Sequence, residues 1–248
     1  MGHEQAEVDD DDRVCGWGAA ARLLWWWRSA HPPQPEPQPQ PTPTEQAGTV
    51  LGTITPFAPG KAALVKPEEL AVSSTVDSSG KFGFTLPNAE AMTTTYGGDL
   101  FPVHDAEQGV GVFGLCSNVK TDAPGSLRLY PLNKLMTDTG LQLFANTNPQ
   151  NTETLPLTFK VWWFSNQDTT FTFSGECTLW NKVNTTLTLK RGWNVLDVAL
   201  YSDHTTVTPG AQPDAAQAWT PFNAGGLGGL SLRPNLLEPW KVVPDFRR

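Results

Sequence analysis

Residues 157–200 read LTFKVWWFSNQDTTFTFSGECTLWNKVNTTLTLKRGWNVLDVAL, and this stretch decides the fold class. Apolar or aromatic residues alternate with polar ones at a period of two, the signature of strands that bury one face. We expect four strands, at residues 157–164, 170–173, 177–189 and 193–200. Turn-forming residues separate them at 166–168, 174–175 and 190–192. No helical period competes, so the stretch predicts an antiparallel β core.

The composition of the chain agrees with an all-β protein that is rich in turns. Of its 248 residues only 17% are charged, while 22 are Gly and 22 are Pro. Such a chain has room for one or two domains, and this composition is typical of short strands joined by turns. We therefore predict an antiparallel β-sandwich over residues 47–203, flanked by a disordered N-terminal arm, 1–46, and an irregular C-terminal tail, 204–248.

The arm does not read as folded protein. It contains the acidic run Asp9–Asp12, the apolar run 16–27 and the proline-rich run HPPQPEPQPQPTPT at 31–44. The apolar run is too short to span a membrane and fits either a degraded signal segment or an apolar patch of a disordered arm. His31 stands where a lipoprotein signal would carry its acylated Cys, which suggests a true start upstream. The alternating Pro residues predict an extended spacer, with a ligand for proline-reading domains as the alternative.

Strand candidates continue outside the central stretch. They lie at residues 49–57, 69–76, 110–119, 126–132 and 141–146, and the segments between them read as loops. Beyond Tyr201 the alternation breaks, and TPGAQPDAAQ and NAGGLGGL are rich in Gly, Pro and Ala. Such low-complexity segments rarely pack, so we expect the tail to be irregular, its last apolar residues either docking or serving a partner.

The segment TVDSSGKFGFTLP, residues 75–87, predicts a hairpin in which an Asp-Ser-Ser-Gly turn leads into an alternating strand. Together with GTITPF before it, the segment resembles the opening of carboxypeptidase-regulatory-like (transthyretin-like) β-sandwich domains. A D-x-x-G-x-F-x-F strand is typical of that family, and Asp77, Gly80, Phe82 and Phe84 match it. Similar segments open many bacterial envelope lipoproteins, in which a GWN strand also recurs. The resemblance covers about forty residues and implies a fold, not an activity.

The predicted strands also nominate interior residues. Alternating positions in the strongest strands give four expected core residues, Phe82, Phe84, Leu187 and Trp193. Cys116 and Cys177 lie in predicted strands and either form a disulfide or remain two buried thiols, with Cys15 left over in the arm. A disulfide would imply an oxidising compartment.

The central stretch supplies the candidate ligand-binding residues. Adjacent side chains of a strand point to opposite faces, so Trp162 and Trp163 cannot share one. One of them is either exposed and able to stack on sugars or bases, or packed under a second layer. A basic cluster lies nearby in the sequence. The full set of candidates is Trp162, Trp163, Trp180, Lys182, Lys190 and Arg191.

The net charge argues against nucleic acid as the main partner. The chain carries a formal charge of −8, and an acidic protein repels the phosphates of duplex DNA and of anionic membranes. A local basic patch formed by the cluster above would be the exception. No segment of the sequence is apolar over the length of a transmembrane helix.

The sequence nominates no catalytic residue, no metal ligand and no cofactor. Ser202, Asp203 and His204 are consecutive, so they cannot converge as nucleophile, base and orienting group. The four His residues lack the spacing of metal ligands. The glycines at 225–229 lack the Lys-Ser/Thr ending of a phosphate-binding loop.

These observations favour a non-catalytic, extracytoplasmic β-sandwich protein of the cell envelope. Its expected role is scaffolding, adhesion or the binding of a ligand, with an envelope component or a carbohydrate as partner. One alternative is a cytoplasmic protein that binds double-stranded DNA during protection or repair. The other is a metal-dependent hydrolase.

Overall fold

The central strands of the molecule are β10 (Leu157–Ser165) and β13 (Gly192–Leu200), which pair antiparallel over nine residues. This computed structural model describes residues 45–60, 62–151, 154–222 and 237, all within the unit Thr42–Arg248. The prediction for residues 1–44 lies outside the described residues. The prediction of an all-β fold is confirmed.

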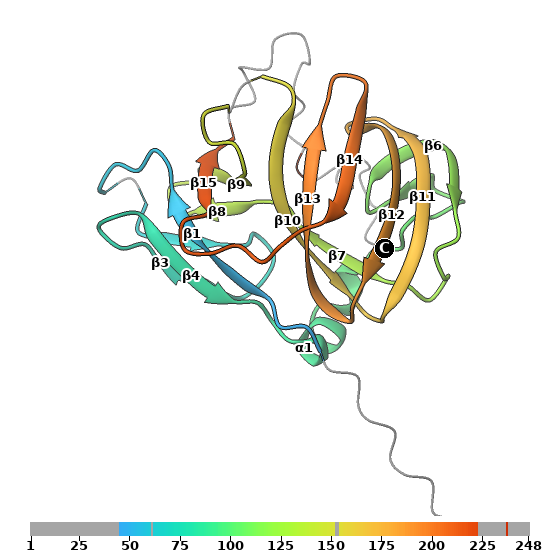
Figure 1. Cartoon of the computed structure of the whole chain (residues 1–248). Coiled ribbons are helices and arrows are strands. Elements are labelled where there is room, and N and C mark those ends of the chain that lie inside the picture. Colours follow the sequence, from blue (N-terminus) through green and yellow to red (C-terminus); the bar gives the residue numbers. More distant parts are fainter. Residues whose placement is uncertain (1–44, 61, 152–153, 223–236, 238–248) are drawn as a thin grey trace, which may run out of the picture. The chain divides into compact units, whose positions relative to one another are not determined.

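Strands β10 and β13 lie in the middle of a continuous sheet of fifteen strands (Figure 1). Its main path runs β3-β2-β8-β9-β10-β13-β14-β12-β11-β6-β5, with β1, β4, β7 and β15 attached beside it. The pairs β1–β15 and β12–β14 are parallel, and the other described pairs are antiparallel. The remaining elements are β1 (Thr49–Ile54), β2 (Leu64–Lys66), β3 (Ser74–Thr75), β4 (Lys81–Thr85), α1 (Ala89–Thr94), the 3₁₀ helix η1 (Gly97–Asp99), β5 (Val110–Gly111), β6 (Gly114–Thr121), β7 (Leu129–Leu132), β8 (Leu135–Thr137), β9 (Gln142–Asn146), β11 (Thr169–Cys177), β12 (Asn181–Leu189), β14 (His204–Pro209) and β15 (Ala218–Pro221).

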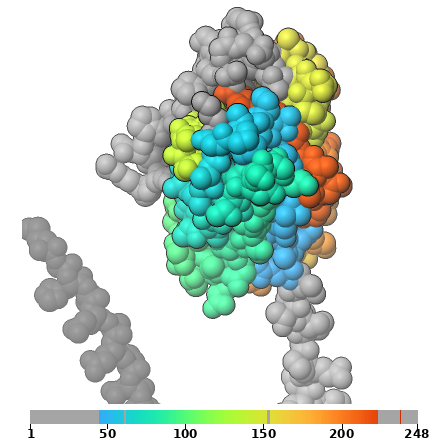
Figure 2. All heavy atoms as spheres, turned by 90° about the vertical axis from the view of Figure 1, so that its left-hand side faces the viewer, coloured from blue at the N-terminus to red at the C-terminus, as the bar shows by residue number. Residues whose placement is uncertain are grey.

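Two hydrophobic cores lie on opposite faces of β10 and β13. The first core is enclosed by the curved half of the sheet, β10 to β14 with β6, and its large aromatic side chains include Phe113, Trp163, Phe171, Phe173 and Trp180. The second core is lined by β1, β4, β8, β9 and β15, and its large aromatic side chains include Phe82, Trp162, Phe164, Trp193 and Trp219. Figure 2 shows the side of the molecule on which the N-terminal segments, from blue to green, form the surface.

The two cores explain why adjacent tryptophans can both be buried. Trp162 points into the second core and Trp163 into the first, because consecutive side chains of a strand face opposite sides. Each indole N–H keeps a partner. Trp162 Nε1 donates to the carbonyl of Thr49 at 3.1 Å, and Trp163 Nε1 donates to Asn133 Oδ1 at 3.1 Å. Burial of large aromatic area with the polar tip satisfied is strongly stabilising.

The central stretch contains four strands as expected, but two boundaries were wrong. Ser174 and Gly175, predicted as a turn, lie inside β11, where the pairing with β6 shifts register. The actual turn is at residues 178–180, where Trp180 is buried in the first core and Asn181 takes a positive φ of 53°. Tertiary burial of Trp180 outweighs the turn preference of Ser-Gly.

Both predicted ends of the folded domain also need correction. Gln46 was assigned to the arm, yet its N–H donates to the carbonyl of Arg191 at 3.0 Å and its carbonyl accepts from Trp193 N at 2.9 Å. The tail boundary at 204 is wrong as well, because β14 and β15 belong to the sheet. Strand β15 pairs with β1, a partner distant in sequence, which local patterns cannot reveal.

The predicted turn before β4 forms as expected, with one difference in pairing. Asp77 Oδ1 accepts from Ser79 N at 2.8 Å and from Lys81 N at 2.9 Å, and Gly80 takes a φ of 83°. Strand β4 then pairs along its length with β1 instead of with the residues before the turn. Phe82 is buried in the second core, whereas Phe84 is only partly buried against it.

Candidate functional site

The three candidate tryptophans do not form a binding surface. Trp162, Trp163 and Trp180 are each at most 1% exposed and belong to the two cores. The alternative of an exposed stacking platform is therefore wrong for these residues, because a second layer of structure covers each face of β10.

The three basic candidates do not converge either. Lys182 and Lys190 lie at opposite ends of β12, about 27 Å apart at the usual rise per strand residue. Lys190 forms an ion pair with Asp168 at 3.4 Å, and the backbone N of Arg191 donates to the same carboxylate at 2.7 Å. The basic residues that are close in sequence are thus separated in the structure, and Asp168 partly neutralises the charge of Lys190.

Cys116 on β6 and Cys177 on β11 are direct cross-strand neighbours joined by a disulfide. Both residues are buried at the rim of the first core. The bond links β6 to the neighbouring strand β11 across a sequence separation of 61.

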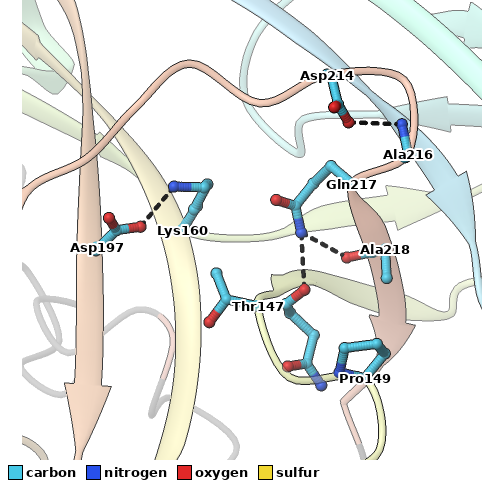
Figure 3. Close-up of a pocket in the computed structure, with 9 residues that line it drawn as sticks. Thr147, Pro149, Lys160, Asp197, Asp214, Ala216, Gln217 and Ala218 are labelled. Carbon is cyan, nitrogen blue, oxygen red and sulfur yellow. Dashed lines mark hydrogen bonds and ion pairs between the residues drawn. The ribbon is translucent and has the colours of Figure 1, made fainter.

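A groove of about 520 Å³ lies where the second core gives way to solvent. We use "the groove" for the space bounded by the end of β9 with residues 147–149, by the pair β10–β13, and by residues 214–218 leading into β15 (Figure 3). Lys160 is two positions before Trp162, and Asp197 is two positions after Val195. Both therefore project from the face that carries the second core.

Lys160 and Asp197 form the wall of the groove on the β10–β13 side. They are directly opposite each other in the pairing of β10 with β13, and Lys160 Nζ lies 2.6 Å from Asp197 Oδ1. The Lys160 side chain is only 14% exposed, whereas that of Asp197 is 43% exposed. The ammonium group is thus held in place and the carboxylate remains open to the groove.

Gln217 and Asp214 lie on the opposite side. Gln217 Nε2 donates to the carbonyl of Asn146 at 2.8 Å and to that of Ala218 at 3.0 Å, which fixes the carboxamide. Its oxygen points toward the Lys160–Asp197 pair in Figure 3. Asp214 Oδ1 accepts from Ala216 N at 2.8 Å and holds the turn before β15.

The groove therefore presents one ammonium donor and several fixed acceptor oxygens, and none of its described lining residues is aromatic. Such a lining suits a small polar ligand that both donates and accepts hydrogen bonds. Sequence reasoning missed this site. The signal was a single charge inside each of two apolar strands, Lys160 in LTFKVWW and Asp197 in VLDVAL, although their register could not be read from either strand alone.

A second, smaller hollow of about 240 Å³ lies between residues 102–105 and 121–128. It is lined by His104, Asp105 and Arg128 among others. Burial lowers the pKa of His104, and the Asp105 carboxylate opposes part of this shift. Arg128 Nη1 donates to the carbonyls of Gly125 and Leu127, so part of the guanidinium is already used within its own loop.

The described residues contain no group of three or more His, Cys, Asp or Glu side chains placed to hold a metal ion. None of the helices within the described ranges has the length and apolar character needed to cross a membrane.

Comparisons of the chain with protein-family models, with curated proteins and with solved structures return no match.

Proposed function

We propose that this protein is a disulfide-bonded, extracytoplasmic binding protein whose groove accepts a polyhydroxylated ligand, such as a glycan of the cell envelope. The observation that carries the proposal is the fixed Lys160–Asp197 pair facing Gln217 across the groove. A sugar hydroxyl donates one hydrogen bond and accepts others, so neighbouring hydroxyls match an ammonium group beside acceptor oxygens. Pre-organised partners bind with a smaller entropic cost.

The charge of the groove supports a neutral ligand over a phosphorylated one. Asp197 and Asp214 outnumber Lys160, and the whole chain carries −8. Phosphate groups would be repelled by this balance. The duplex-DNA alternative also loses its basic patch, because Lys182 and Lys190 lie at opposite ends of β12.

The location outside the cytoplasm is supported by the pair Cys116–Cys177. Disulfides persist in oxidising compartments and are rare where thioredoxin and glutathione keep thiols reduced. The proline-rich segment at 31–44, typical of spacers, and the resemblance of residues 75–87 to envelope domains favour the same location.

The ligand is tested by calorimetric titration with a panel of neutral oligosaccharides at physiological salt. Asp197→Asn is expected to weaken binding about tenfold or more, because a hydrogen bond to a charged group contributes about 1.5–3 kcal/mol. Asp168→Asn is the matched control, since it makes the same change at an exposed carboxylate outside the groove. Two outcomes would contradict the proposal that the groove binds a neutral sugar: equal affinities for the two variants, or no binding of any oligosaccharide of the panel to the wild type.

The location is tested in the cells that naturally produce the protein. Free thiols are blocked at lysis, and the masses of the peptides that contain Cys116 and Cys177 are measured before and after reduction. We expect both cysteines to escape the blocking reagent until they are reduced. If both carry the label beforehand, the extracytoplasmic location loses its main support.

A further inference from the structure

Leu237 lies deep in the first core although it is fifteen positions beyond Phe222, which follows the last strand. Its exposed fraction is 1%, and its neighbours belong to the cluster that contains Trp163, Leu127 and Phe113. A leucine from the C-terminal part of the chain thus completes a core built by strands far upstream. The tail predicted to be irregular contributes at least this one residue to the fold.

A buried asparagine recognises the backbone of the same residue. Asn133 lies between β7 and β8 and is 3% exposed. Its Nδ2 donates to the carbonyl of Leu237 at 2.9 Å, while its Oδ1 accepts from Trp163 Nε1 at 3.1 Å. Both halves of the carboxamide are therefore used, and loss of Leu237 would remove an acceptor from a buried donor, which is costly.

The pocket around Leu237 is formed by the first core and Asn133. It contacts two features of this residue, the apolar side chain and the main-chain carbonyl. Domains that bind short peptides use the same two features, a pocket for a side chain and hydrogen bonds to the main chain. We propose that this pocket is a peptide-binding site, that its ligand is the chain's own segment around Leu237, and that it accepts the same segment from a second copy of the chain.

The sequence that joins the last strand to Leu237 supports exchange between copies. Residues 223–236 read NAGGLGGLSLRPNL, with four Gly among fourteen residues, a composition typical of linkers. The contacts that hold Leu237 involve the first core and Asn133, so they are the same whichever copy supplies the segment. The local concentration set by the linker favours the chain's own segment, and a vacant pocket is open to a neighbour's.

The test uses a fluorescent peptide of residues 231–243 and full-length chains, with binding followed by fluorescence anisotropy. The Leu237→Ala chain, whose own segment fits poorly, is expected to bind one peptide per protein. The wild-type chain should bind it at least about thirtyfold more weakly, because its pocket is already filled. A peptide carrying Leu237→Ala should lose about thirtyfold or more in affinity for the Leu237→Ala chain, as expected for truncation of a buried leucine. A Leu237→Met peptide, of similar volume, should lose no more than about tenfold.

A surface leucine provides the matched control. Leu141 is 39% exposed, and the Leu141→Ala chain should behave as the wild type does. If the Leu237→Ala chain fails to fold, the wild-type chain is given a protease site between Gly226 and Leu227 and is cut in the presence of excess labelled peptide. One labelled peptide should then co-elute with each cut protein. The proposal is overturned if the peptide binds neither chain, or if peptides with leucine and alanine at 237 bind alike.

Discussion

Single side chains decide where solvent meets the sheet. Lys160 and Trp162 are two positions apart on one face of β10, yet the lysine lines the groove and the tryptophan is buried in the second core. On β13, Asp197 likewise lines the groove, whereas Val195, two positions away on the same face, is buried in the second core. The second core does not extend past Lys160 and Asp197, because an ion pair needs solvent on one side to avoid a large desolvation cost.

Asp77 provides a pH-dependent prediction at the scale of one residue. Hydrogen bonds from the Ser79 hydroxyl and from the backbone N of Lys81 lower the pKa of Asp77 below its ordinary value. The carboxylate therefore stabilises the fold above the unfolded-state pKa, and this contribution is lost as the pH falls through the folded-state value. We expect the urea midpoint of the wild type to fall more steeply from about pH 5 to pH 2 than that of Asp77→Asn.

The Asn side chain keeps an acceptor for the turn but does not titrate in this range. Urea unfolding at neutral pH, where the wild-type carboxylate is fully ionised, gives the reference for both proteins. Parallel pH profiles for the two proteins would show that the Asp77 carboxylate does not contribute in this way.

At the scale of elements, β11 and β12 show how one strand pair separates core from surface. In both strands buried residues alternate with exposed ones, so the first core lies on one side and a Thr-rich face on the other. Thr170 and Thr188 hydroxyls are 3.0 Å apart across this face. Beyond β11, strand β6 pairs with β5 only at its start. The rest of β6 carries Lys120, and its pairing with β11 shifts register between Ser174 and Glu176, two features that discourage edge-to-edge association.

Adjacent residues of β12 allow a matched test of this arrangement. Leu187 is fully buried in the first core, and Thr186 is exposed. We expect Leu187→Ala to lower the free energy of unfolding by about 2–5 kcal/mol, through lost burial and the cavity left behind. Thr186→Ala should change it by no more than about 0.5 kcal/mol. Guanidinium titrations measure both, and comparable losses would mean that the strand register is wrong.

The disulfide gives a second prediction at this scale. It closes a loop with a sequence separation of 61, and the chain-entropy relation gives a stabilisation of about 4 kcal/mol for a loop of this length. The double change Cys116→Ser and Cys177→Ser should lower the free energy of unfolding by an amount of this order. The reduced wild type, measured in the same titration, is the control and should resemble the double variant. A stability unchanged by both treatments would contradict the expectation.

At the scale of the whole molecule, the N-terminal boundary of the fold has a direct test. Gln46 forms two main-chain hydrogen bonds with the β12–β13 turn region, and Glu45 Oε1 accepts from Ala89 N at the start of α1. Removal of residues 1–44 should change the melting temperature by less than about 2 °C, since their composition cannot bury a core. Removal of residues 1–46 should lower it by about 3–10 °C, because these hydrogen bonds contribute roughly 1–3 kcal/mol together.

Differential scanning calorimetry of the two truncated proteins and the full chain shows whether the folded domain begins at residue 45 or at residue 47. The two truncations differ by only two residues, so the shorter one serves as the control for the longer. A large loss after removal of residues 1–44 would show that the arm contributes to folding after all.

Much of the fold class follows from the sequence, because the period of two is a local property. The alternation in residues 157–200 determined that the centre of the chain forms four strands, and the Asp77–Gly80 pattern determined a turn before β4. Leu187 and Trp193 were identified as core residues by the same alternation.

What only the tertiary structure decided concerns contacts between residues far apart in the chain. The burial of Trp162 and Trp163 on both faces of β10, the meeting of Lys160 with Asp197 and the insertion of Leu237 beside Asn133 each depend on partners brought together by the whole sheet. Local periodicity says which face a side chain takes, but not what covers that face. That choice is made by non-local packing, and it determines both the groove and the pocket.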